Sequence, residues 1–291
     1  MKFGICYSYF QHSWDGGFET YRDAIPKVAR LGFETLEVGT TDLTAMSDDQ
    51  LETLRRLCEE HGIALTAGGG MGKAHNAASE DESIRKNGVQ RLKSFLPAMQ
   101  KAGVKKMCGV YFGYWMYDYS QPVNKPAAWA QSVKSMREMA DAAAQYGIEL
   151  MLEVVTRYEH FLLNTAAEAV RYVQEVGRPN VKILLDTFHM NIEEDSLAGA
   201  IRTAGKHLGH MHIGEANRKL PGKGRLPWRE VADALKEIGY QGDLVMEPFV
   251  LSNCEVGDTL YLFHDLSDGA SDEQLAEDAA DSLRFVKGLF V

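Results

Sequence analysis

Short apolar runs alternate with longer amphipathic stretches along the whole of this 291-residue chain. Each short run is four to six residues long and mostly apolar, as in parallel strands that are buried on both faces. The amphipathic stretches between them indicate helices. The pattern predicts eight strands, at residues 2–7, 35–38, 63–67, 106–110, 149–154, 181–186, 209–213 and 244–247.

The ends of the predicted helices carry recognisable capping residues. Ser47 is followed by acids and by Gln50, which is typical of a helix start, and Gly62 follows His61 where that helix should stop. Other glycines lie where a helix should end before the next strand, at positions 32, 103, 147, 177 and 239. This alternation predicts one (β/α)₈ barrel domain over residues 1–291. An open doubly wound sheet is the alternative, but no GxGxxG follows the first strand.

Four long irregular segments follow a predicted strand and precede a predicted helix. They cover residues 68–80, 111–124, 214–228 and 250–270. In a barrel, these segments lie at the carboxyl ends of the strands, where active sites are built. The glycines at 68–70 would let the backbone approach a substrate closely.

Charged residues end four successive strands that are otherwise apolar. Glu153, Asp186, His212 and Glu247 are separated by 33, 26 and 35 residues, about one strand–helix unit per step. Their side chains should therefore converge at the mouth of the barrel. A carboxylate at the end of a buried strand is costly unless it is paired or binds a cation. Separate ion pairs or capping roles would explain each residue alone, but the matched positions favour one metal site.

Three carboxylates and one imidazole form a mainly oxygen-rich set of ligands. Such a set suits Mn²⁺, with Co²⁺ or Mg²⁺ as alternatives, better than a structural zinc site.

Composition and charge narrow the classes of partner. The formal net charge of −10 disfavours nucleic acid and anionic lipid but does not oppose a neutral sugar. The four cysteines have no metal-binding spacing and are expected to be reduced and mostly buried. The first residues lack the features of a signal peptide, and no run of about 18 apolar residues occurs. We therefore expect a cytoplasmic enzyme without a membrane partner.

Several segments resemble the ketose 3-epimerases, a group that includes D-tagatose and D-psicose 3-epimerases in the xylose-isomerase-like barrel superfamily. The resemblance extends from the GICYSYF opening to the helix after SDGASDEQ, and its most specific motifs are EVVTRYE, LLDTFHMNIEE, GHMHIGEANR, PGKGRLPW and VMEPF. It implies metal-dependent, reversible C3 epimerisation of a free ketose, such as D-fructose with D-psicose or D-tagatose with D-sorbose. It also implies a homodimer or homotetramer.

The resemblance further implies that Glu153 and Glu247 are metal ligands and the catalytic acid/base pair. Epimerisation removes a proton from one face of C3 and returns one to the other face. Two carboxylates that flank the carbon can alternate as base and acid, whereas one fixed base cannot readily serve both faces. The metal ion would polarise the ketone and stabilise the enediolate.

Three more residues match family positions that contact the substrate and the metal-bound carboxylates: Glu159, His189 and Arg218. Other roles stay open for them, namely a helix-start acid, a loop residue and a surface ion pair. His210 is expected to be a hydrogen-bonded neighbour of His212 rather than a fifth ligand.

The far end of the sugar would meet Tyr7, Trp14, Trp115 and Gly69, since aromatic faces pack on the C–H face of a sugar. Core packing is the alternative for each aromatic residue.

Some features qualify the substrate assignment. The loop at 222–225 (GKGR) lacks the spacing of a phosphate-binding loop, which favours a free ketose over a sugar phosphate. The chain departs from the family pattern at Thr156, at Tyr158 and across 250–264, which leaves the preferred ketose open.

Other functions remain as alternatives to epimerisation. Within the superfamily these are an aldose–ketose isomerase, a hydroxypyruvate isomerase or an inosose dehydratase, and only substrate tests separate them. An endonuclease-IV-like nuclease would need more strand-end histidines and a basic groove. A non-catalytic sugar-binding protein would not need two carboxylates and a metal around one carbon.

Overall fold

A computed structural model describes all residues from 1 to 291. Eight parallel strands pair in chain order and close into a barrel, because β1 pairs with both β2 and β8. The strands are β1 (Lys2–Cys6), β2 (Thr35–Gly39), β3 (Ala64–Gly70), β4 (Lys106–Val110), β5 (Glu149–Val154), β6 (Val181–Asp186), β7 (Leu208–Ile213) and β8 (Asp243–Met246). The predicted (β/α)₈ barrel is therefore confirmed.

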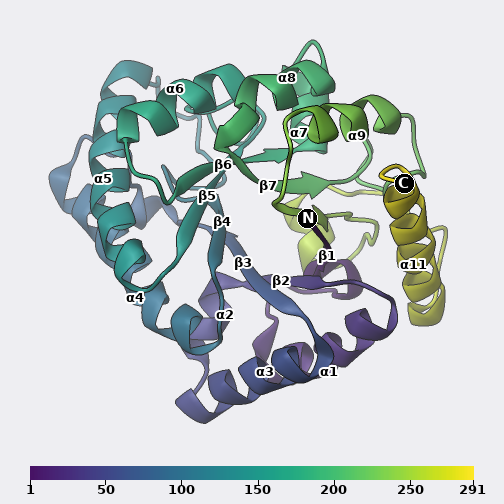
Figure 1. Ribbon diagram of the computed structural model, residues 1–291. Helices are drawn as coiled ribbons and strands as arrows, with labels where there is room; N and C mark the ends of the chain where they lie inside the picture. Colours follow the sequence, from purple (N-terminus) through teal and green to yellow (C-terminus); the bar gives the residue numbers. More distant parts are fainter.

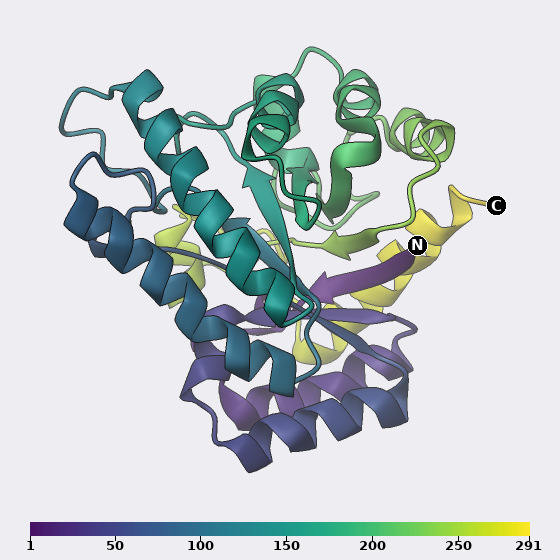
Figure 2. The same ribbon diagram turned by 60° about the vertical axis from the view of Figure 1, so that its left-hand side comes forward.

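The helices surround the strands, as Figure 1 shows in a view close to the barrel axis. They are α1 (Gly17–Arg30), α2 (Thr40–Ala45), α3 (Asp48–His61), α4 (Glu82–Lys101), α5 (Lys125–Gln145), α6 (Ala166–Val176), α7 (Thr187–Glu193), α8 (Leu197–Ala204), α9 (Trp228–Glu237), α10 (Glu255–Thr259) and α11 (Asp272–Gly288). Short 3₁₀ helices cover Tyr7–Phe10, Lys73–His75 and Gly205–His207. The two chain ends lie near each other, and α11 lies beside β1 (Figure 2). Lys287 of α11 lies over the ring of Phe3 in β1, and Phe290, two residues after the helix, packs edge-on against the same ring.

The predicted helix ends are confirmed. Ser47 and Gln50 form a reciprocal capping box at the start of α3, and Gly62 ends that helix in the left-handed conformation. The five other glycines predicted to end helices also have positive φ angles, which a side chain would disfavour. Local sequence thus determines where these helices end.

Several predicted strand boundaries need correction, most of them by one residue. Tyr7 begins a 3₁₀ helix instead of ending β1, and Glu247 follows β8 by one residue. The segment at 68–80 is not wholly irregular, because β3 continues to Gly70. This extension depends on glycine: a Cβ added to Gly109 of β4 would lie 1.9 Å from the carbonyl oxygen of Gly69.

The segment at 250–270 is also not wholly irregular, because it contains the short helix α10. All four cysteines are free and buried, as expected. No helix is both long and apolar enough to cross a membrane.

Candidate active site and metal centre

A cavity of about 500 Å³ opens at the carboxyl ends of the strands. Its volume is within the usual range of small-molecule sites. The loops that follow the strands supply most of its wall, as the sequence predicted for the irregular segments. Most of the predicted site residues line it: Tyr7, Trp14, Gly69, Trp115, Glu153, Glu159, His189, His212, Arg218 and Glu247. Asp186 lies beside them, within contact distance of Arg218.

The four strand-end residues meet in one cluster. Glu153 comes from β5, Asp186 ends β6, His212 comes from β7 and Glu247 follows β8. One donor atom of each lies within 4.8 Å of the donor atoms of the other three. His212 is central, because its Nδ1 lies 3.4 Å from Oε1 of Glu153 and 3.4 Å from Oε1 of Glu247. The barrel thus brings together residues that are 94 positions apart in sequence (247 − 153).

The donor set fits a divalent metal ion. Nδ1 of His212 is buried and has no hydrogen-bond partner, although it faces two carboxylates. Three carboxylates and one imidazole offer the hard, mainly oxygen ligands that Mn²⁺, Co²⁺ and Mg²⁺ accept. A buried group of like charges without a cation would be costly. The chemistry of these residues therefore favours a metal at their centre.

The protonation of the cluster leads to the same conclusion. Burial, with the nearby charges of Glu153 and Asp186, raises the pKa of Glu247 to about 8 against the opposing effect of His212. Burial also raises the pKa of Asp186, although Arg218 and His212 oppose this. Burial alone would lower the pKa of His212, but Glu247 and Glu37 raise it well above its usual value. Without a metal the cluster retains protons, which a bound cation would displace.

Arg218 lies over the cluster rather than on the surface. Its Nη1 is 3.2 Å from Oδ2 of Asp186 and 3.4 Å from Oε2 of Glu247. Its guanidinium carbon lies 3.6 Å from the centre of the Phe188 ring, so the side chain is held by stacking as well as by charge. Because the residue is only 8% exposed, the alternative of a surface ion pair does not apply.

His189 lies at the start of α7, with its ring beside the cluster. Its Nδ1 accepts a hydrogen bond of 3.3 Å from the backbone N–H of Thr156, so Nε2 carries the ring hydrogen. That nitrogen lies 3.8 Å from Oε1 of Glu153 and 3.7 Å from Oδ2 of Asp186. Burial, aided by the charges of Arg218 and His212, lowers the pKa of His189 well below its usual value. His189 is thus a neutral hydrogen-bond donor.

Glu159 and Trp115 form a pair at the rim. The indole Nε1 of Trp115 donates a 2.6 Å hydrogen bond to Oε2 of Glu159, and Nη2 of Arg218 lies 3.8 Å from Oε1 of Glu159. Glu159 lies in a turn after β5 and does not start a helix. Burial raises its pKa.

The other predicted aromatic residues lie on the opposite side of the cavity wall. The hydroxyl of Tyr7 donates to the carbonyl of Trp14, and Nε1 of Trp14 donates to Oγ1 of Thr259 at 3.2 Å. Leu260 from the same atypical segment also lines the cavity. The 250–264 stretch therefore shapes the pocket through its contact with Trp14.

The loop at 222–225 encloses a carboxylate of the chain itself. The backbone N–H groups of Gly222 and Leu226 donate to the Glu215 carboxylate at 2.9 and 3.1 Å. Nε1 of Trp228 donates to it at 2.6 Å. The expectation that this loop is not a phosphate site agrees with this arrangement.

Inside the barrel His210 is a neighbour of His212, as expected, with ring centres 5.4 Å apart, and the cluster of four ligands does not include it. Sequence reasoning missed its other neighbour, Glu37. Nε2 of His210 lies 3.3 Å from Oε2 of Glu37, and its Nδ1 has no hydrogen-bond partner. Glu37 is buried inside the barrel and contacts His212. Burial alone would raise the pKa of Glu37, but His212 and His210 hold it well below its usual range. A lone glutamate in the apolar run at 35–38 was the available signal.

Comparison with known proteins agrees with the fold. Residues 25–286 match the xylose isomerase-like TIM barrel family. The chain is 46% identical over 285 residues to the D-psicose 3-epimerase of Agrobacterium fabrum, with 98% of each chain covered. A crystal structure of D-psicose 3-epimerase in the presence of D-fructose is 45% identical, with a TM-score of 0.96 over 100% of this chain and 99% of that one.

A second crystal structure, of D-psicose 3-epimerase with D-tagatose from Clostridium cellulolyticum H10, is 43% identical. Its TM-score is also 0.96, over 100% of this chain and 99% of that one. Near-complete coverage at this identity, on a closed barrel, identifies the family. The chain belongs to the ketose 3-epimerases of the xylose isomerase-like TIM barrel family.

Proposed function

We propose that this chain catalyses the metal-dependent, reversible epimerisation of a free ketose at C3, with D-fructose and D-psicose as one substrate pair. The observation that carries the proposal is the meeting of Glu153 and Glu247 at His212, each 3.4 Å from Nδ1, although they come from β5 and from the end of β8. Relatives with the same fold are D-psicose 3-epimerases, and solved structures include D-fructose and D-tagatose.

Glu153 and Glu247 are proposed to act as the two acid/base groups. The C3 proton of a ketose is a weak acid, and inversion requires removal from one face and return to the other. One carboxylate removes the proton while the other supplies one, and the roles exchange in the reverse reaction.

Glu153, Asp186, His212 and Glu247 are proposed to hold the metal. When bound, a divalent cation polarises the ketone and stabilises the negative charge that develops as C3 loses its proton. We propose Mn²⁺ as this ion, with Co²⁺ or Mg²⁺ as alternatives, because the set has three hard oxygen ligands and one imidazole.

Arg218 and His189 are proposed to orient the reacting end of the sugar. Both present N–H donors beside the carboxylates, and both are buried. Glu159, held by Trp115, would accept a hydrogen bond from a sugar hydroxyl. Tyr7, Trp14 and Gly69, with the indole of Trp115, would line the site for the far end of the ketose. The cytoplasmic location stays a prediction. The homodimer or homotetramer also stays a prediction, and light scattering would measure the oligomeric state.

The experiment uses Glu153→Gln and Glu247→Gln in D₂O with D-fructose and, separately, D-psicose. Each variant should form the epimer at least about 100-fold more slowly, because one face of C3 loses its acid/base group. Each should still exchange the C3 hydrogen of one of the two sugars, and the two variants should differ in which sugar exchanges.

Metal content is measured in both variants, so that loss of the ion is not mistaken for loss of a base. Turnover near that of the wild type in either variant would contradict the two-base mechanism. Formation of an aldose by the wild type would instead support the isomerase alternative.

A further inference from the structure

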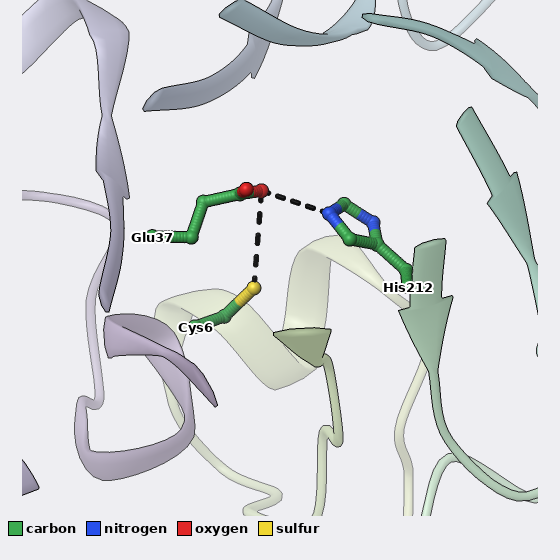
Figure 3. Close-up of side chains that lie close together, drawn as sticks. All are labelled: Cys6, Glu37 and His212. Atoms are coloured by element: carbon green, nitrogen blue, oxygen red, sulfur yellow. Dashed lines mark hydrogen bonds and ion pairs between the residues drawn. The ribbon is translucent and has the colours of Figure 1, made fainter. Parts of the chain in front are cut away.

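Beneath the proposed metal site, Glu37 contacts His212 from the opposite side of the imidazole ring. Figure 3 shows the Glu37 carboxylate pointing at the ring, with the Cys6 thiol below it. Oε1 of Glu37 lies 2.8 Å from Nε2 of His212 and 4.0 Å from Sγ of Cys6. Glu37 comes from β2, far around the barrel from β7, so its side chain crosses the barrel interior.

The two nitrogens of His212 face different partners. Nδ1 faces Glu153 and Glu247 and has no hydrogen-bond partner. Nε2 faces a carboxylate, which can only accept a hydrogen bond. Nε2 must therefore carry a hydrogen, and in the neutral ring this leaves the lone pair of Nδ1 free to bind a cation.

Other interior residues hold Glu37 in this position. The hydroxyl of Thr66 donates a 2.6 Å hydrogen bond to Oε2, and Nε2 of His210 lies 3.3 Å from the same oxygen. Gly68 leaves room for the carboxylate, because an added Cβ would lie 2.7 Å from Oε1 of Glu37. The side chain is only 4% exposed. Burial of a carboxylate is costly, and apolar replacements of buried charges are often neutral or stabilising. Fold stability alone therefore does not account for a glutamate at this position.

We propose that Glu37 is a positioning residue that fixes the orientation and tautomer of His212, so that Nδ1 faces the metal. This inference rests on the proposed function, since it assumes that His212 is a metal ligand. Glu37 would act through His212 and not on the sugar. Carboxylates that accept a hydrogen bond from a ligating histidine typically account for 10- to 100-fold of metal affinity.

The test measures Mn²⁺ binding to metal-free protein, with free Mn²⁺ followed by electron paramagnetic resonance. Glu37→Gln keeps the size of the side chain but adds an NH₂ group that can donate to Nε2, which permits the wrong tautomer. We expect its affinity for Mn²⁺ to fall roughly 10- to 100-fold. Glu37→Asp keeps the charge but is one methylene too short for the 2.8 Å contact, and we expect a loss in the same range.

Thr35→Val is the matched control. Thr35 lies two residues before Glu37 on the same face of β2, is buried, and has a hydroxyl without a partner. The Mn²⁺ affinity of the Thr35→Val variant should stay within about twofold of that of the wild type. The melting temperature of each metal-free protein separates a metal effect from a folding effect. If Glu37→Gln does not fold, Glu37→Asp and Thr66→Val provide the test instead. For Thr66→Val, which removes one hydrogen bond to Glu37, we expect a smaller loss of Mn²⁺ affinity.

Two results would overturn the inference, and they are distinguishable. Wild-type affinity in a folded Glu37 variant would overturn the positioning role and leave the proposed function intact. A wild-type chain that binds no Mn²⁺ would overturn the proposed metal site and this inference together.

Discussion

At the scale of single residues, His160 shows how burial fixes a protonation state away from the cavity. The side chain is fully buried, stacks on Phe161 and meets the edge of Phe112. Its Nδ1 accepts a hydrogen bond from the N–H of Leu162 at 3.1 Å, and Nε2 has no partner. Burial lowers the pKa of His160 from 6.5 to about 3, so the folded protein keeps this ring neutral.

This shift predicts a specific dependence of stability on pH. Between pH 3 and 6.5 the unfolded chain binds a proton at His160 that the folded chain does not bind. The contribution is therefore fully present above pH 6.5 and is lost as the pH falls toward 3, by about 1.4 kcal/mol per pH unit. We expect His160→Asn, whose Oδ1 can still accept from Leu162, to show a shallower fall in urea unfolding experiments.

The difference between wild type and variant isolates His160, since other titrating groups contribute to both. Parallel curves between pH 3 and 6.5 would show that burial does not hold this imidazole neutral.

The roles of some site residues could be identified from sequence, whereas the role of Glu37 could not. Each of the four proposed metal ligands is a polar residue at the end of an apolar run, so the sequence alone marks it as unusual: Glu153, Asp186, His212 and Glu247. Glu37 acts across the barrel, and its partner depends on which strand ends face each other in three dimensions. The tautomer of His189 depends in the same way on a backbone N–H from another loop.

At the scale of elements, the loop between β7 and α9 carries Arg218 to the site and is organised around Glu215. This carboxylate is fully buried and accepts hydrogen bonds from two backbone N–H groups and from the indole of Trp228. Gly224 is required beside it, because a Cβ there would lie 2.3 Å from Oε2 of Glu215. The loop thus folds around the Glu215 carboxylate, and this fold positions Arg218 at the site.

Glu215→Gln should therefore destabilise the protein and also slow turnover. The amide NH₂ would face N–H donors and leave at least one of them unpaired, a loss of about 3 kcal/mol in the free energy of unfolding. Urea unfolding measures this loss, and the rate with D-fructose measures the displacement of Arg218.

Glu230→Gln, an exposed position on α9, is the control and should change stability by less than about 0.5 kcal/mol. Equal stability of the two variants would show that the Glu215 carboxylate does not organise the loop.

The elements themselves could be predicted to different degrees. Capping residues and apolar runs are local, so α3 and most strands were located from sequence. The continuation of β3 to Gly70 requires Gly109 of a neighbouring strand, and α10 packs through Val256 in a cluster with Phe249 and Trp14. Such boundaries depend on partners that the local pattern does not reveal.

At the scale of the whole molecule, the barrel gathers one acidic cluster, one arginine and two histidines at a single end of the fold. The chain has a net charge of −10, so a divalent cation is attracted to it and a neutral ketose is not repelled. The closed sheet keeps the strand ends in register, and this fixes the distances on which the proposed chemistry depends. Activity should therefore require two components, the metal ion and the free ketose.

The most direct test incubates metal-free protein with D-fructose, with and without added Mn²⁺, and separates the sugars by chromatography. D-psicose should form with Mn²⁺, be absent without it, and be absent again when a chelator is added. Formation of D-psicose at the same rate without any metal would contradict the proposed role of the Glu153, Asp186, His212 and Glu247 cluster.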